Sequence, residues 1–175
     1  MAIREILLLG NPVLRAKCEK VKSFSDAGLE DTARDLRDTL ANFRRMHGFG
    51  RGIAAPQIGV SRKVIFISID RPFELVNPEI VKRSKQMMTL WDDCFSFPDL
   101  LVKVKRHTRI SVRYRDINGS RLRLDAEDGL SELLQHEIDH VNGILAVDRA
   151  IDSRHIVLRS EWEKLTRARG KGYRF

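Results

Sequence analysis

Between residues 25 and 48, apolar positions recur at spacings of three and four, and most positions between them are charged. This spacing places the apolar side chains on one face of a helix. Ser25 or Asp26 can cap the first turn, and His47-Gly48 is a typical stop. The pattern predicts a long amphipathic N-terminal helix with a buried face of Leu29, Ala33, Leu36, Leu40 and Phe43.

After residue 63 the pattern changes to short apolar runs and alternation, which are typical of strands. Asn77-Pro78 interrupts the second of these strands, and the turn at 116–119 leads into a hairpin strand that carries Leu122 and Leu124. Before this hairpin strand, the segments with a strand pattern are 63–69, 75–81, 86–90, 101–105 and 110–114.

Helical spacing returns in the C-terminal part of the chain. Residues 130–142 carry an apolar stripe after a predicted loop at 125–129. Asp152 or Ser153 then caps a last helix that ends near Arg169. The inner stripe predicted for this last helix is Leu158, Trp162 and Leu165.

Length and composition favour one domain, residues 1–175, because 175 residues with 42% hydrophobic content suffice for a real core. Two cysteines are too few for the disulfide framework of a secreted protein. The apolar run at 6–9 is too short for a signal peptide, and no run reaches membrane-spanning length. These features predict a cytoplasmic location and no membrane partner.

The formal net charge of +8 favours a polyanionic partner, such as RNA or a ribonucleoprotein, over a small acidic substrate. The most basic element is the last helix with its tail, although a solvated helical face is an equally good interpretation. Its cationic residues are Arg154, Arg159, Lys164, Arg167, Arg169, Lys171 and Arg174.

The helix predicted at 130–142 contains the pattern His-Glu-x-x-His, from His136 to His140. Residues four apart share a helix face, so both imidazoles can bind one divalent ion while Glu137 handles protons at a water on that ion. The pattern has only three fixed positions, so it could also occur by chance on a solvated helix. The apolar stripe favours function, because ionisable groups packed into a core need partners.

Cys94 is the leading candidate for the third ligand, with Asp92 and Asp93 as rivals. An isolated cysteine is by default a core residue. Beside two imidazoles, however, a thiolate leaves one position of a tetrahedral ion open for water, as in a catalytic site. A divalent ion lowers the pKa of such a water towards about 7.

The glycine-spaced segment from Gly50 to Gln57 predicts a loop whose backbone turns tightly or approaches something closely. A phosphate cradle is one interpretation, but the segment lacks the Lys-Ser/Thr pair and the strand–loop–helix order of a nucleotide site. We therefore expect no bound nucleotide. A loop packed against a site, with the Gln57 amide as donor, is the better interpretation.

Taken in order, three motifs resemble those of the peptide deformylase family. Gly50 to Gln57 resembles the first motif, Cys94-Phe95-Ser96 the second, and Gln135 to His140 the third. The N-terminal run Asn-Pro-x-Leu-Arg at 11–15 also fits, so the resemblance covers nearly the whole chain. The resemblance implies an α+β fold, with mixed or antiparallel sheets around a central metal-binding helix, a long N-terminal helix and a C-terminal helix.

The resemblance also implies hydrolysis of the N-formyl group from the N-terminal formylmethionine of newly made polypeptides. Cys94, His136 and His140 would hold one divalent ion per chain, and Glu137 would act as general acid and base. Family members usually hold Fe(II) and often work with Zn, Ni or Co. The last helix resembles the C-terminal helix of bacterial members, which docks on the ribosome.

Further roles are implied at matching positions. The Gln57 amide and the Phe95 N–H would stabilise the developing oxyanion. Arg106 and Asp139 match an ion pair that steadies the metal-binding helix. The substrate-binding positions are Gly52, Ile53, Asp92, Asp93 and Leu133.

Two features depart from the family pattern. The second motif normally begins Glu-Gly-Cys, whereas here Asp92-Asp93 precedes the cysteine, and Glu132 falls near a pocket-wall position that is often apolar or basic. Three alternatives follow: a related hydrolase for another small N-acyl or formamide substrate, a non-catalytic metal-binding protein on the ribosome, and a general His-Glu-x-x-His protease. Glu137 disfavours the second, and Cys94 disfavours the third.

Overall fold

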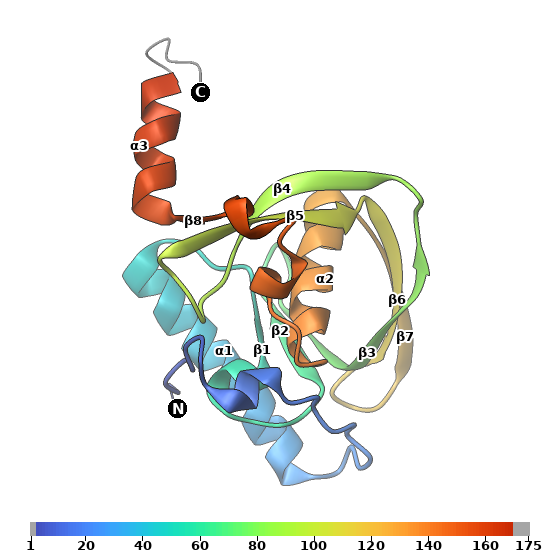
Figure 1. Cartoon of the computed structure of the whole chain (residues 1–175). Helices are drawn as coiled ribbons and strands as arrows, with labels where there is room; N and C mark the ends of the chain where they lie inside the picture. Colours follow the sequence, from blue (N-terminus) through green and yellow to red (C-terminus); the bar gives the residue numbers. More distant parts are fainter. Residues whose placement is uncertain (1–2, 170–175) are drawn as a thin grey trace.

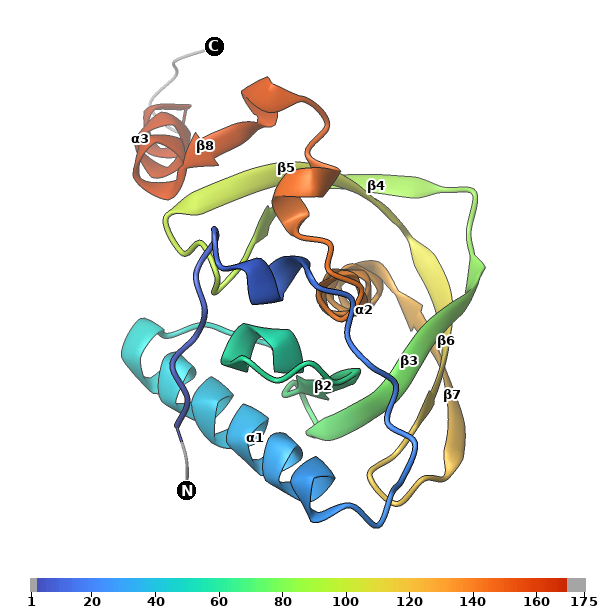
Figure 2. The same ribbon diagram turned by 60° about the horizontal axis from the view of Figure 1, so that its bottom comes forward.

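Two antiparallel sheets pack around helix α2 (Asp128–His140) in the computed structural model, which describes residues 3–169 (Figure 1). Figure 2 shows α2 nearly end-on, with strands on both sides of it. The larger sheet has the order β1-β2-β3-β6-β7, formed by Gly52–Ala54, Val64–Ile67, Phe73–Arg83, Arg109–Arg115 and Arg121–Glu127. The smaller sheet has the order β4-β5-β8, formed by Met87–Asp93, Leu100–His107 and Ile156–Leu158. This arrangement confirms the predicted α+β fold with a central helix.

Helix α1 (Ala27–His47) confirms the predicted N-terminal helix. The Asp26 side chain accepts a hydrogen bond from Gly28 N at 2.9 Å. Gly48 ends the helix in the left-handed region, with φ of +77°. The fully buried leucines of its inner face are Leu29, Leu36 and Leu40.

The larger sheet lies between α1 and α2. Alternate side chains of its strands point to opposite faces, so one face packs against each helix. On β2, Val64 and Phe66 belong to the apolar cluster that includes the α1 leucines. Ile65 and Ile67 belong to the cluster that includes Leu134 of α2. The strand therefore holds both helices in fixed positions relative to β1, which lies next to β2 at the sheet edge.

Strand β3 runs through Asn77-Pro78, where the sequence predicted an interruption. The register with β6 shifts between Val76 and Glu79, and Asn77 has a positive φ of 53°. The Asn77 side chain donates to Val21 O at 2.8 Å and accepts from Val21 N at 2.9 Å. A bulge thus accommodates the proline, which has no N–H to donate to the ladder.

The loop predicted at 125–129 is wrong. Strand β7 pairs with β6 up to Glu127, and α2 begins at the next residue, Asp128. The alternation that begins at Leu122 and Leu124 continues to Ala126, but alanine is a weak apolar signal between Asp125 and Glu127, so the end of the strand was taken for a loop. The segment 48–59, predicted as a loop, likewise contains β1 and a short 3-10 helix.

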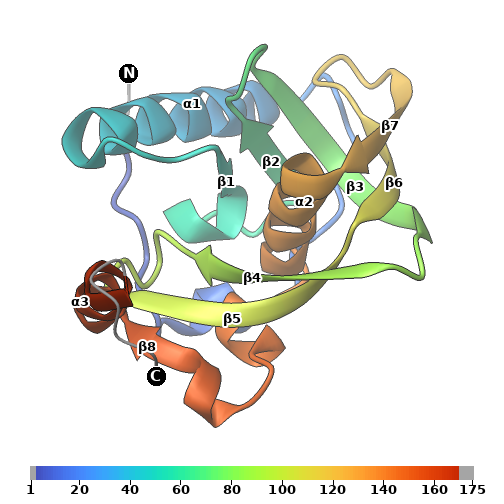
Figure 3. The ribbon, with the colours of Figure 1, turned by 90° about the horizontal axis from the view of Figure 1, so that it is seen from above.

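The last helix begins later than predicted. Ile156–Leu158 forms β8 and pairs with β5, and helix α3 spans Arg159–Arg169. Leu158 is therefore not part of the helix, and Leu165 is 43% exposed. Figure 3 shows that α3 lies at one edge of the molecule, beyond β8 and the end of β5. Lys171 and Arg174 of the predicted basic tail lie outside the described residues.

Short 3-10 helices complete the connections, at Pro12–Arg15, Ala55–Ile58, Ala146–Arg149 and Ser153–His155. None of the helices within residues 3–169 combines the length and the apolarity needed to cross a membrane.

Candidate active site

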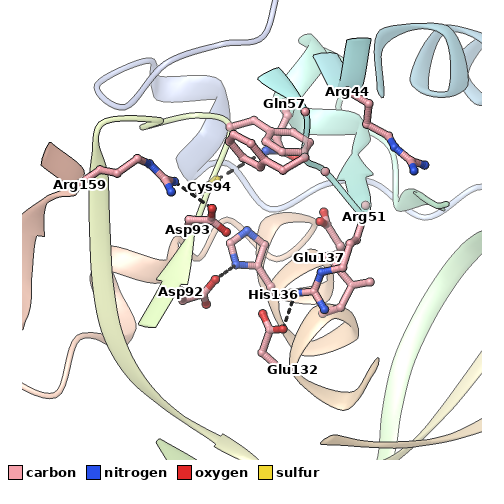
Figure 4. A pocket seen from close by; sticks show the side chains of 16 residues that line it. Arg44, Arg51, Gln57, Asp92, Asp93, Cys94, Glu132, His136, Glu137 and Arg159 are labelled. Atoms are coloured by element: carbon pink, nitrogen blue, oxygen red, sulfur yellow. Dashed lines mark hydrogen bonds and ion pairs between the residues drawn. The ribbon is translucent and has the colours of Figure 1, made fainter. Parts of the chain in front are cut away.

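A cavity of about 550 Å³ opens between the N-terminal half of α2, β1, the end of β4 and the end of α1 (Figure 4). Ten successive residues of α2, from Ser131 to His140, are buried, so the His-Glu-x-x-His pattern lies inside the molecule. His136 and Glu137 line the cavity, and Cys94 reaches it from the turn after β4. The fold therefore joins motifs that are distant in sequence.

Cys94, His136 and His140 bring three metal-donor atoms together. Cys94 Sγ lies 3.2 Å from His140 Nε2, which lies 3.1 Å from His136 Nε2. All three side chains are buried, and their donor atoms lie within 4.8 Å of one another. Two ring nitrogens this close cannot both carry a proton towards each other, so their lone pairs suit a shared cation. The predicted ligand set fits a divalent ion of the Zn, Fe, Ni or Co type.

A second group of potential ligands consists of Asp92, Glu132 and His136, whose donor atoms also lie within 4.8 Å of one another. Both carboxylates are already engaged, however. Asp92 Oδ2 accepts from Arg106 at 3.0 Å, and Glu132 Oε2 accepts from Arg51 at 2.6 Å. The cysteine-containing group is therefore the better metal site.

Asp92 is 3% exposed, and it fixes the orientation of His136. His136 Nδ1 donates to Asp92 Oδ1 at 2.9 Å, which leaves Nε2 free for a metal ion. Burial raises the pKa of the Asp92 carboxyl, but His136 and Arg106 outweigh it and lower the pKa to about 2. The sequence predicted Asp92 as a substrate-binding residue or a rival metal ligand, and its orienting contact with His136 was missed.

An ion pair between Arg106 and Asp139 ties β5 to α2 and confirms the predicted pair. Arg149 adds two further bonds to Asp139, at 2.8 and 3.2 Å. Arg106 also bonds Asp92, so one buried guanidinium connects the metal-binding helix with the strand that precedes Cys94. A charged network of this kind holds the ligands in place when all its members are paired.

Glu137 is buried, and its Oε2 has no hydrogen-bond partner among the described residues. Burial raises the pKa of its carboxyl to about 7. A Cβ on Gly52 would lie 2.8 Å from Glu137 Oε1, so the glycine leaves room for this side chain. A carboxyl with a pKa near neutral and an unpaired oxygen is well suited to accept and return a proton.

Gln57 presents its amide N–H groups to the site. Its Oε1 accepts from Ala54 N at 2.9 Å, which fixes the orientation of the amide. Its Nε2 then lies 3.6 Å from Cys94 Sγ and 3.4 Å from Ser96 Oγ. Within residues 3–169, no hydrogen bond occupies the Phe95 N–H. Two donors thus lie beside the candidate metal ligands.

Charged pairs surround the cavity mouth. Arg159, the first residue of α3, bonds Asp93 Oδ2 at 2.8 Å and Pro98 O at 2.9 Å, and its guanidinium lies 5.3 Å from the centre of the Phe49 ring. Arg51 bonds Glu132 on the other side. Figure 4 shows the two pairs on either side of His136. Sequence reasoning placed Arg159 only on a basic helical face, and no local pattern links it to Asp93.

The predicted substrate-binding residues do not all reach the cavity. Gly52, Asp92, Asp93 and Leu133 line it. Ile53 is fully buried in the apolar cluster against α1, because β1 alternates and its neighbours point towards α2. Any contact of Ile53 with a substrate must therefore come from its main chain.

Hydrolysis of an amide with the help of a metal ion requires donors that leave the ion accessible and a base beside it. The cavity has candidate residues for both, an arrangement that is typical of a metal-dependent hydrolase. Comparison with known proteins narrows this class. A family model described as "Polypeptide deformylase" matches residues 3–155, and the chain belongs to this family. Its activity is removal of the N-formyl group from newly made polypeptides, and it depends on a metal ion.

Relatives and solved structures agree with this assignment. A peptide deformylase of Heliobacterium modesticaldum is 41% identical over 150 residues, which are 85% of this chain and 95% of the relative. The crystal structure of a peptide deformylase from Legionella pneumophila has a TM-score of 0.80 at 34% identity, over 97% of this chain and 98% of that one. The crystal structure of a peptide deformylase from Thermotoga maritima has a TM-score of 0.79 at 31% identity, over 87% of this chain and 100% of that one.

Proposed function

We propose that Cys94, His136 and His140 are the metal ligands and that Fe(II) is the physiological ion, with Zn, Ni or Co as working substitutes. The convergence of one sulfur and two imidazole nitrogens supports the ligand set. When bound, such an ion polarises the formyl carbonyl and lowers the pKa of water towards about 7. The preference for Fe(II) rests on resemblance to the family, since this donor set accepts all four ions.

Glu137 is the proposed general base and acid. It takes a proton from the attacking water and then passes it to the amine that leaves with the peptide. Its unpaired buried oxygen and its pKa of about 7 support this assignment. This carboxyl beside three converging donors is the single observation that carries the proposed mechanism.

Gln57 and Phe95 are the proposed oxyanion donors. As the formyl carbon becomes tetrahedral, negative charge develops on its oxygen, and fixed N–H groups stabilise that charge. The orientation of the Gln57 amide by Ala54 N supports this role, because the donor does not have to reorganise during the reaction. Loss of one such donor costs about 2.7–4 kcal/mol in other enzymes.

The nascent peptide is proposed to extend along β1 with its formylmethionine in the cavity. β1 is the edge strand of the larger sheet, so the free side of its backbone can pair with an extended chain. Gly52 and Ile53 would contribute main-chain groups, and Leu133 and Asp93 would border the methionine side chain. Asp92 would act by orienting His136 and would not contact the substrate itself. Its bond to His136 Nδ1 favours this role over the predicted substrate-binding role.

The deciding experiment measures formate release from formyl-Met, formyl-Leu and acetyl-Met peptides by anaerobically prepared, metal-analysed enzyme. We expect formyl-Met to be the preferred substrate, and Glu137→Gln to lose at least about 100-fold in kcat with unchanged metal content. Glu127→Gln, the same change at an exposed glutamate directly before α2, tests whether the loss of any carboxylate near this helix gives the same result. Activity retained in Glu137→Gln would refute the assigned base.

We further propose that residues 1–175 form a single catalytic domain that works in the cytoplasm and docks on the ribosome through α3. Arg159, Lys164 and Arg167 lie on this helix, and Leu165 is exposed on it. Truncation after Arg159 retains β8 and the bond to Asp93, and should weaken ribosome co-sedimentation in low salt. Unchanged co-sedimentation of a folded truncated enzyme would refute docking through α3.

A further inference from the structure

A second cavity, of about 460 Å³, lies at the C-terminal end of α2. Three residues of the segment before α1 line it, Lys17, Cys18 and Lys20, together with the residue before β2, the bulge of β3 and Asn142. It shares no lining residue with the active-site cavity. Four cationic side chains line this second cavity: Lys17, Lys20, Lys63 and Arg83.

Lys63 is the unusual member of this group, because it is only 8% exposed. A buried ammonium group is costly unless it is paired with an acid. The one hydrogen-bond partner found for its Nζ within the described chain is neutral, Asn142 Oδ1 at 2.6 Å. Burial, together with Lys17 and Lys20, lowers the pKa of Lys63, so nearby cations make its charge still less favourable.

The cavity has little negative charge of its own. Among the described residues, Glu79 is the only acid in its lining, and the Glu79 carboxylate already bonds Arg113 at 2.9 Å. Cys18 also lines the cavity, but burial raises the pKa of its thiol to about 11, so the thiol is neutral at physiological pH. The four lining cations therefore exceed the acid that faces them.

Backbone hydrogen bonds fix the main-chain segments that carry Lys17, Lys20 and Lys63. Lys63 N donates to Glu19 O at 2.9 Å, and Asn77 N donates to Lys63 O at 2.8 Å. Cys18 N donates to Val141 O at 3.1 Å, which ties the lysine-bearing segment to the end of α2. The main chain and the Lys63 side chain are therefore ordered before an anion binds, and only the exposed Lys17 and Lys20 side chains remain to be ordered.

We propose that this cavity binds a phosphate group between Lys17, Lys20 and Lys63. Lysine ammonium groups are established phosphate binders, and an anion would supply the charge that Lys63 lacks. Arg83 also lines a neighbouring cavity that contains Lys82 and Arg109. The phosphate could therefore belong to a small phosphorylated molecule or to an RNA backbone that continues along these cations.

The first test measures the thermal unfolding midpoint of the metal-loaded enzyme against inorganic phosphate at constant ionic strength. A ligand that binds only the folded state raises this midpoint in a saturable way. The parent and Lys105→Met, an exposed lysine outside the cavity, should both respond. The double variant Lys17→Met/Lys20→Met should bind phosphate about tenfold more weakly.

The design separates failure of folding from failure of binding. Lys17 and Lys20 are exposed, so their replacement should leave the fold and formate release unchanged. Lys63→Met should abolish the response as well and, because it removes a buried charge, should not destabilise the enzyme. An equal phosphate response in all variants would place the anion elsewhere, for example at the metal ion, and would overturn the proposal. No saturable response would overturn it also.

A labelled single-stranded RNA of about twelve nucleotides distinguishes the two sources, by fluorescence anisotropy. If RNA is the ligand, the double variant binds it about tenfold more weakly than Lys105→Met, with a reduced dependence on salt. If phosphate binding depends on the two lysines but RNA binding does not, the site takes a small phosphorylated molecule. Either result supports the phosphate site. If the double variant binds both phosphate and RNA as tightly as Lys105→Met does, the proposal is refuted.

Discussion

Replacing Asp92 by asparagine should weaken metal binding about 10- to 100-fold while the fold stays intact. The carboxylate accepts from His136 Nδ1 at 2.9 Å and from Arg106 Nη2 at 3.0 Å. Asparagine has nearly the same shape and retains one acceptor oxygen, but it loses the negative charge. His136 would become a weaker ligand, and Arg106 would keep Asp139 as its charged partner.

The magnitude can be worked from the carboxyl itself. Its pKa is lowered from 3.8 to about 2 in the folded protein. A shift of about two pKa units corresponds to about 2–3 kcal/mol of interaction with the charged form. Because Arg106 accounts for part of that interaction, a 100-fold loss of metal affinity, about 2.8 kcal/mol, is the upper limit that we expect.

The assay is competition for Zn²⁺ or Co²⁺ with a chelator of known affinity, followed by formate release at saturating metal. Asp93→Asn is the matched control, because Asp93 bonds Arg159 at the mouth and makes no bond to a ligand histidine. The control should bind metal within about twofold of the parent. Equal metal affinity in Asp92→Asn and the parent would refute the orienting role of Asp92.

Three further predictions concern the cavity. Gly52→Ala should lower kcat at least about tenfold, because the new Cβ would meet Glu137 Oε1 at 2.8 Å; unchanged kcat would show that Glu137 has room to move. Arg159→Met should leave kcat unchanged and raise KM about two- to fivefold for peptides with an acidic second residue, because Asp93 loses its partner and its carboxylate then repels the acidic residue. An equal rise in KM for peptides with a basic second residue would contradict this. In the metal-free protein, Glu137→Gln should match the parent in urea unfolding at pH 4. Because the pKa of Glu137 is raised from 4.5 to about 7, the parent loses stability as pH rises through this window, and the variant should be more stable by about 3 kcal/mol at pH 8. The same difference in stability at pH 4 and at pH 8 would exclude the raised pKa.

A local pattern was sufficient to predict that two candidate metal ligands share one face of α2. The spacing of His136 and His140 fixes both imidazoles on one face of α2, whatever the rest of the fold does. Cys94 needed the added argument that two histidines leave a ligand missing, and the structure brings its sulfur within 3.2 Å of His140. The helix α1 was equally predictable, because its apolar period, its cap at Asp26 and its stop at Gly48 all agree.

Elements that depend on a distant partner were not predictable. Ile156–Leu158 was assigned to the last helix because Asp152 and Ser153 resemble a helix start. Asp152 does cap a 3-10 turn, but the open edge of β5 then takes up the β-branched residues as β8. The same limit applies to Ile53, whose orientation is set by the alternation of a three-residue strand between two helices.

The mouth of the cavity shows most clearly why a motif cannot be judged alone. In the sequence, Asp93 and Glu132 are unpaired acids that depart from the family pattern and raise doubt about a methionine pocket. In the structure each faces an arginine, Asp93 with Arg159 at 2.8 Å and Glu132 with Arg51 at 2.6 Å. A pair of opposite charges presents a much weaker field to an uncharged methionine side chain than a lone carboxylate does. The arginines lie 66 and 81 positions away from their partners, so the compensation exists only once α3 and β1 have packed at the same opening.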